Sequence, residues 1–230
     1  MVLRIMTAAS AIRVLRGQYP GRFSTELGID LSRGRSRDIF KWFLASVLFG
    51  ARISESIVKK TFREFASRAI VSPKVILDTG WDGLVEVLDQ GGYVRYDFKT
   101  ATKLLDLCRA LTQDYQADLA NLHAAAADGK DLEQRIKSLA KGIGDVTAGI
   151  FLREMRGIWE KADPLPSDLV VMAAHHRGIV PKTVRDRRKI LEHLVRAWKN
   201  AGMRLKDFPD FEAALVRAGI ELRRGGRGGL

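Results

Sequence analysis

Apolar residues recur at spacings of three and four along most of this 230-residue chain. The pattern is clearest from residue 39 to residue 70, where a break near FGARIS separates two helical stretches. Further helical stretches follow, interrupted by glycine and proline, to about residue 218. No segment alternates apolar and polar residues as a half-exposed strand does. The sequence therefore predicts an all-α protein, long enough to bury a sizeable core.

Two features argue against a membrane-spanning or cluster-bearing protein. The longest apolar run, WFLASVLFGA at 42–51, is about half as long as a bilayer crossing, so we expect a buried helix and no membrane contact. Cys108 is the single cysteine, whereas an iron–sulfur cluster needs about four thiolates. A lone cysteine also fits a reducing cytoplasm, where we expect the protein to act. The first 25 residues carry four arginines and no acid; a targeting presequence shares this composition, but we favour a basic amphipathic helix of the fold.

Positive charge is concentrated at the two ends of the chain. Of the formal net charge of +12, residues 1–37 contribute +5 and residues 182–230 contribute +7, so the middle is neutral. Ends that share one sign predict a common basic surface, suited to a polyanion such as DNA or RNA. A solvated basic face kept for solubility is the alternative, and we favour the nucleic-acid surface.

The charge pattern and a polar linker at 27–38 suggest two lobes. We expect residues 38–160 to form a central helical lobe and residues 1–37 to pack with 161–222 as a basic helical lobe. The last residues, 223–230, read RRGGRGGL, a low-complexity sequence that predicts a disordered basic tail.

A glycine turn in LAKGIGDVTAGIFL, at 139–152, joins two predicted helices. We call residues Gly142, Ile143, Gly144, Asp145 and Val146 the hairpin rim. Their backbone N–H groups and the positive end of the second helix dipole suit a phosphate group. Such a contact would reach the nucleic-acid backbone without reading bases. A glycine C-cap between two structural helices is the simpler alternative.

Asp168 follows the proline-spaced link ADPLPS and precedes an apolar helix. Its carboxylate would stabilise a developing positive charge rather than a phosphate. Ser167 or Asp168 at a helix start is also a common N-cap, which contributes about 1 kcal/mol to stability. The local sequence leaves both roles open, and the two are compatible.

The order of these motifs, LAKGIGDVTAGIFL, a spacer and then PLPSDLVVMAA, resembles the helix-hairpin-helix glycosylase superfamily of base-excision repair. The LPSD form looks most like bacterial 3-methyladenine DNA glycosylase II, and the segments upstream are similar to the endonuclease III pattern. The resemblance covers roughly residues 38–200. It implies a two-lobed helix-hairpin-helix DNA glycosylase fold with the motif at 131–159.

The resemblance also assigns roles to single residues. Asp168 matches the catalytic aspartate, and Gly142, Gly144 and Val146 match the positions that grip DNA phosphates. Ala51 and Arg52 fall where relatives insert a side chain into the gap left by an extruded base. Ala51 is too small to fill that gap, so we expect Arg52 to do so; loss of this function is the alternative.

A monovalent cation is the only bound ion that the resemblance implies, and no cofactor is required. The backbone carbonyls of Ser138, Ala140 and Ile143 match positions that hold K⁺ or Na⁺ in several relatives. Tyr93 and Tyr96 lie on a polar turn and are candidates to stack on a flipped base.

Together these features lead us to expect a monomeric, monofunctional DNA glycosylase that acts on damaged bases in double-stranded DNA, alkylated purines being favoured by the LPSD similarity. Bifunctional relatives carry a Schiff-base lysine at the position of Val146, so we expect no lyase activity. A non-catalytic helix-hairpin-helix DNA-binding protein is the alternative.

Overall fold

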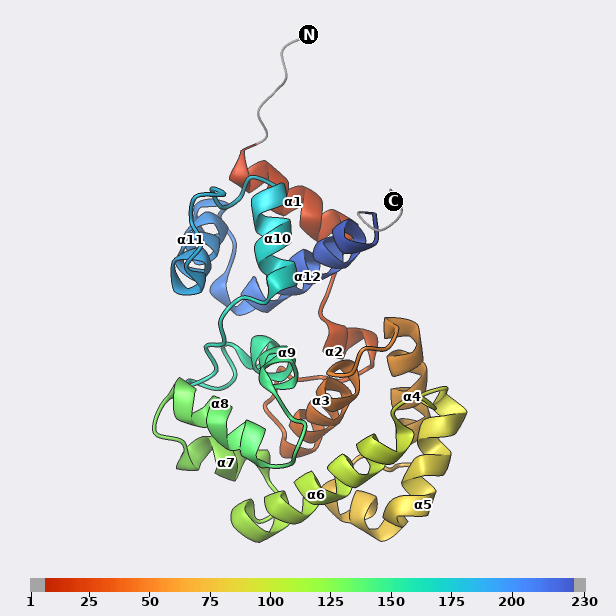
Figure 1. The fold of residues 1–230 in the computed structure, drawn as a ribbon. Coiled ribbons are helices and arrows are strands. Elements are labelled where there is room, and N and C mark those ends of the chain that lie inside the picture. The colour runs from red at the N-terminus through yellow and green to blue at the C-terminus, as the bar shows by residue number, and fades with distance from the viewer. Residues whose placement is uncertain (1–6, 226–230) are drawn as a thin grey trace. The chain divides into compact units, whose positions relative to one another are not determined.

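The computed structural model describes residues 7–225, and regular structure within them is entirely helical (Figure 1). This confirms the predicted all-α class. The chain divides into two compact units, Leu27–Asp163 and a smaller unit formed by Met1–Glu26 with Pro164–Leu230. No helix within the described residues is long and apolar enough to cross a membrane.

The larger unit contains seven of the described helices: α3 (Ser36–Phe49), α4 (Glu55–Ser67), α5 (Pro73–Gly91), α6 (Asp97–Tyr115), α7 (Leu119–Ala125), α8 (Gly129–Ser138) and α9 (Asp145–Met155). Helix α3 forms its core, because nearly all of its residues after the first turn are buried. The indole N–H of Trp42 donates to the carbonyl of Phe151 over 3.1 Å, and the rings of Phe43 and Phe151 meet edge to face at 5.0 Å. These contacts fasten α9 to the core helix.

The start of α9 approaches the end of α3 closely. A Cβ added to Gly50 would lie 2.1 Å from the hydroxyl oxygen of Thr147, so only glycine fits at this point. The turn that precedes α9 is therefore held at a defined place on the core.

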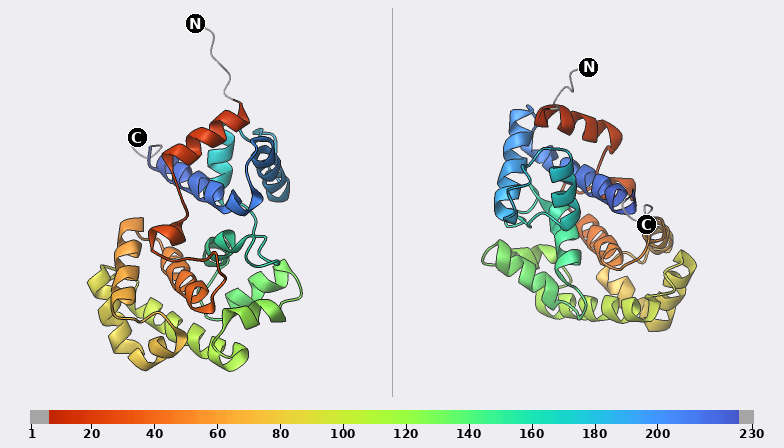
Figure 2. Two further views of the ribbon diagram at one scale, coloured as in Figure 1. Left: turned by 180° about the vertical axis from the view of Figure 1, so that it is seen from behind. Right: turned by 45° about the horizontal axis from the view of Figure 1, so that its top comes forward.

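The smaller unit contains α1 (Ala8–Gln18), α2 (Phe23–Glu26), α10 (Asp168–His176), α11 (Arg187–Asn200), a 3₁₀ turn η1 (Leu205–Asp207) and α12 (Phe208–Gly225). Trp198 stacks on Phe211 at 5.2 Å, and α1 lies against both α11 and α12 (Figure 2). Helix α10 packs tightly on α12: a Cβ on Gly219 would lie 2.4 Å from the carbonyl oxygen of Leu169. This contact sets the position of the first turn of α10.

Net charge divides unevenly between the units. The smaller unit carries eighteen Lys and Arg residues against eight Asp and Glu, whereas the larger unit carries twenty-one against nineteen. The N- and C-terminal parts of the chain, which hold the excess positive charge, thus lie in one unit.

The boundaries differ from those expected in three places. Residues 161–163, expected in the basic lobe, lie in the larger unit. The segment 27–37 lies in the larger unit rather than with the basic lobe, because Ile29 and Leu31 are buried and the hydroxyl of Ser36 donates to Asp118. Arg223 and Arg224, expected in a disordered tail, are helical residues of α12. The rest of the expected tail, residues 226–230, lies outside the described residues.

Candidate functional site

The hairpin turn, residues 139–144, connects α8 to α9. Gly142 adopts a left-handed backbone with φ of 89°, a conformation that glycine tolerates far better than other residues. The N–H of Ile143 donates to the carbonyl of Ala140 over 3.1 Å and closes the turn. Gly144 is the N-cap of α9 and supplies no side-chain cap.

The rim of this turn is exposed and rich in free donors. Within the described residues, the N–H groups of Gly142, Gly144 and Val146 donate no hydrogen bond. The first N–H groups of a helix have no intrahelical acceptor, so they remain available to an external one. Ile143 is the exception on the rim: it is buried, and its N–H is used inside the turn. Val146 is 64% exposed and ends in two methyl groups, so the position presents no amine.

One acidic side chain stands on the rim, and a lysine compensates its charge. Lys137 Nζ lies 2.9 Å from Asp145 Oδ1 and 3.5 Å from Glu133 Oε1. The hydrogen bond to Asp145 raises the pKa of Lys137. The charge of Asp145 would repel a phosphate, and Lys137 reduces that repulsion.

The three carbonyls matched to a cation site lie in and beside the turn. Ser138 is the last residue of α8, so its carbonyl lacks an intrahelical partner. The Ala140 carbonyl accepts one hydrogen bond, from Ile143, and keeps a second lone pair. Backbone oxygens of this kind fit a monovalent cation. No cluster of three or more His, Cys, Asp or Glu residues suited to a metal occurs within residues 7–225.

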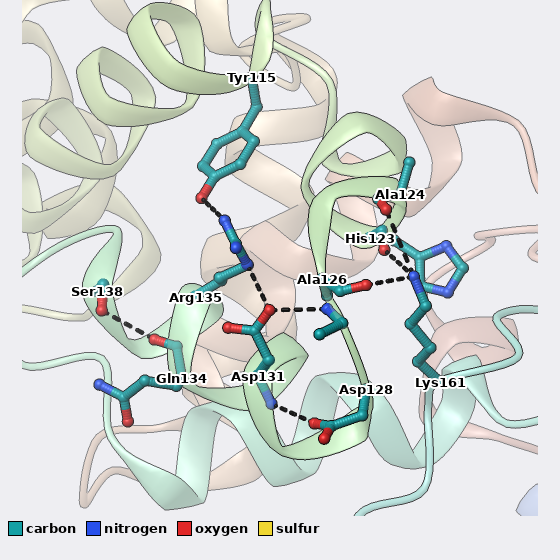
Figure 3. Close-up of polar contacts among 11 residues, drawn as sticks. Tyr115, His123, Ala124, Ala126, Asp128, Asp131, Gln134, Arg135, Ser138 and Lys161 are labelled. Atoms are coloured by element: carbon teal, nitrogen blue, oxygen red, sulfur yellow. Dashed lines mark hydrogen bonds and ion pairs between the residues drawn. The ribbon is translucent and has the colours of Figure 1, made fainter.

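The loop before α8 is tied to the segment after α9, as Figure 3 shows. Lys161 Nζ donates to the carbonyls of His123, Ala124 and Ala126 at the end of α7. The His123 ring stacks on Trp159, with ring centroids 4.7 Å apart. Asp131 accepts from the N–H of Ala127 over 2.8 Å and from Arg135 over 2.9 Å. These contacts hold the segments before α8 and after α9 in place, and with them the hairpin. No local sequence pattern indicates them.

Asp168 is the first residue of α10, and it is not the cap. The cap is Ser167, whose hydroxyl accepts from the N–H of Val170 over 3.5 Å. The Asp168 carboxylate instead accepts a hydrogen bond from Arg187, which also donates to the carbonyl of Pro166. The side chain of Asp168 is 76% exposed. Its carboxylate is therefore exposed to solvent and is not the group that caps the N-terminus of α10.

The two tyrosines proposed for a base pocket differ in accessibility. Tyr93 has no exposed surface, and its hydroxyl donates to the carbonyl of Leu48 over 2.6 Å, so its ring is part of the core. Tyr96 is half-buried, packs edge to face on Tyr93 at 6.3 Å and lies under the guanidinium of Arg95. A cavity of about 230 Å³ in the smaller unit is lined by none of the predicted site residues.

Arg52 occupies the short turn between α3 and α4. Its side chain is exposed, whereas the neighbouring Ala51 is half-buried. The position is thus accessible to a ligand, and its suggested role in filling the gap left by a base stays a prediction.

A glycine turn with free N–H donors between two helices, and an exposed aspartate that opens a later helix, are the parts of a helix-hairpin-helix DNA glycosylase fold. The crystal structure of Helicobacter pylori 3-methyladenine DNA glycosylase (MagIII) bound to 1,N6-ethenoadenine matches this chain with a TM-score of 0.55. The match covers 94% of this chain and 98% of that chain at 14% sequence identity. At this identity the likeness shows the fold alone. No family model and no curated protein sequence matches the chain.

Proposed function

We propose that the protein is a monofunctional DNA glycosylase that flips a damaged base out of double-stranded DNA and hydrolyses its bond to the sugar. The observation that carries the proposal is the Asp168 carboxylate: it opens α10 but leaves capping to Ser167, and it is largely exposed. A carboxylate used only to cap the N-terminus of a helix would instead accept hydrogen bonds from backbone N–H groups.

Asp168 has the charge that the reaction requires. Breaking the bond from sugar to base leaves an oxocarbenium-like sugar, and a nearby carboxylate stabilises this cationic transition state more than the neutral ground state. The same carboxylate can orient or deprotonate the attacking water. Base flipping costs a few kcal/mol and is least costly for damaged or mispaired bases, which favours a lesion as substrate.

The hairpin rim supplies binding energy without base contacts. Its exposed N–H groups would hold backbone phosphates, and a K⁺ or Na⁺ ion on the carbonyls of Ser138, Ala140 and Ile143 would add positive charge next to them. We further propose that the chain works as a monomer in the cytoplasm.

An alkylated purine is the substrate class that we favour. The H. pylori 3-methyladenine DNA glycosylase whose fold is similar was solved with 1,N6-ethenoadenine, and the LPSD motif of this chain resembles that of bacterial 3-methyladenine DNA glycosylase II. Val146 has no amine to attack the sugar carbon, so the reaction would stop at base release. Borohydride treatment with abasic DNA should therefore trap no covalent complex.

A non-catalytic DNA-binding protein is the second candidate, and one observation favours it. The guanidinium of Arg187 already occupies one oxygen of Asp168, which weakens the negative field that a cationic sugar would meet.

Single-turnover base release from duplex oligonucleotides tests the proposal. The panel should contain alkylated purines, uracil and oxidised bases, with Asp168→Asn as the matched variant of equal size. We expect the wild-type chain to release one lesion class and Asp168→Asn to lose about 10²–10³-fold in rate, while it still binds DNA. Salt-sensitive DNA binding without release of any lesion would favour the non-catalytic protein.

A further inference from the structure

Lys103 on α6 lies against the hairpin turn. A Cβ built on Gly142 would lie 3.1 Å from Lys103 Cε and 3.5 Å from Lys103 Nζ. The two residues are far apart in sequence, yet the end of the lysine side chain rests on the one turn residue with a left-handed backbone.

The ammonium group of Lys103 has no acidic partner. No carboxylate of the described residues lies within ion-pairing distance of its Nζ; Asp106, on the next turn of α6, pairs with Arg109, and Asp145 pairs with Lys137. Lys103 is nevertheless half-buried, and this burial lowers its pKa. A partly desolvated, uncompensated ammonium lowers stability, so a structural role alone does not explain the charge.

The free donors of the turn point to a ligand for this charge. The N–H groups of Gly142 and Gly144 donate no hydrogen bond within the described chain, and both residues are exposed. N–H donors and an ammonium placed side by side share one complementary partner, an anion with several acceptor oxygens.

We propose that Lys103 binds a backbone phosphate of DNA together with the N–H groups of the hairpin turn. The inference rests on the proposed function and adds to it a side-chain contact from α6. Because the contact is to phosphate, it contributes affinity and salt dependence rather than sequence preference.

Lys103→Met is the decisive variant, because methionine keeps an unbranched chain against Gly142 and removes the charge. Lys60→Met is the matched control, because Lys60 is an exposed lysine of α4 that pairs with no acid among residues 7–225. Binding of undamaged duplex DNA would be measured by fluorescence anisotropy from 50 to 200 mM salt, with Tm recorded for each protein.

We expect Lys103→Met to weaken binding about three- to tenfold at low salt and to reduce the slope of log Kd against log salt by about 0.9, the value for one phosphate contact. Its Tm should equal or exceed that of the wild-type chain, and Lys60→Met should keep the wild-type slope.

An unchanged slope in Lys103→Met, or a lower Tm with unchanged binding, would overturn the Lys103 inference and leave the proposed function standing. If the wild-type chain bound no duplex DNA, the proposed function would fail and this inference with it.

Discussion

Arg187, in the first turn of α11, donates hydrogen bonds to both the Asp168 carboxylate and the Pro166 carbonyl. The guanidinium thus bridges the loop before α10 and the side chain proposed to be catalytic. Both charged side chains are more than a third exposed, so the ion pair contributes little to stability, about 1 kcal/mol or less. The ion pair matters because it fixes the position of the Asp168 carboxylate relative to the loop before α10.

Replacing Arg187 with Gln should therefore reduce base release more than stability. We expect the single-turnover rate to fall about tenfold, because small displacements of a catalytic group are costly, with little change in Tm. The rate of Arg187→Lys should lie between those of the wild-type chain and Arg187→Gln, since lysine keeps the charge but cannot contact both acceptors as a guanidinium does. A rate that stayed equal or rose would show that Arg187 does not position Asp168.

Ser167→Ala separates capping from catalysis at the start of α10. Loss of the cap should lower the free energy of unfolding by about 1 kcal/mol, while base release at a temperature well below Tm stays near wild type. Ser167→Asp keeps an acceptor at the cap and should recover most of the stability, as urea denaturation would show. If Ser167→Ala abolished release without destabilising the protein, the division of roles between Ser167 and Asp168 would be incorrect.

Gly142 and Gly144 provide a pair for testing the hairpin turn. Gly142→Ala forces a side chain into a left-handed backbone and against Lys103, so we expect a loss of roughly 1–2 kcal/mol in stability and weaker DNA binding. Gly144 has φ of −116° and open space around its Cβ position. Gly144→Ala should be nearly neutral for stability and still weaken binding, because the added methyl would meet the phosphate. Unchanged binding in both variants would remove the hairpin from the interface.

Asp145→Asn tests whether the rim faces phosphate. Removing this negative charge should tighten duplex binding about two- to fivefold at low salt, as expected for one repulsion across several ångströms of water. The free energy of unfolding should fall by a few tenths of a kcal/mol, because the Asp145 carboxylate interacts favourably with the N-terminus of α9. Anisotropy titrations and thermal melts would measure both effects; weaker binding by the variant would contradict the proposed interface.

His123 predicts how stability depends on pH. Burial, and next the charge of Lys161, lower its pKa below the usual value of about 6.5. The unfolded chain therefore binds the proton more readily than the folded chain. The stability that the neutral His123 contributes is present above about pH 6.5 and is lost as pH falls through the pKa of the folded chain. His123→Phe preserves a ring against Trp159 and should reduce the loss on acidification, measured by urea denaturation at pH 7.5 and pH 5.5. Equal acid sensitivity in both proteins would exclude His123 as its cause.

Local sequence predicted much of the fold. The all-α class and the glycine-hinged hairpin were evident from apolar spacing and from Gly142 and Gly144, because helices and turns depend on residues a few positions apart. The start of α10 was evident too, although Ser167 and Asp168 remained equal candidates for the cap. Only the observed hydrogen bonds distinguish them.

Other features could not be predicted from the sequence, because they depend on contacts between residues that are distant along the chain. Tyr93 was expected on a polar turn, but its hydroxyl reaches the carbonyl of Leu48, and the ring is buried. The pairing of Arg187 with Asp168 spans nineteen positions, and no local pattern indicates it.

The sequence by itself determined the helices, the hairpin turn and an aspartate at a helix start, since each follows from short-range periodicity and backbone preference. Tertiary structure decided which charges are compensated: Asp145 by Lys137, Asp168 by Arg187, and Lys103 by no acid of the described chain. Packing brings these groups together, and the energy of a charge depends on its neighbours and its burial rather than on its place in the chain.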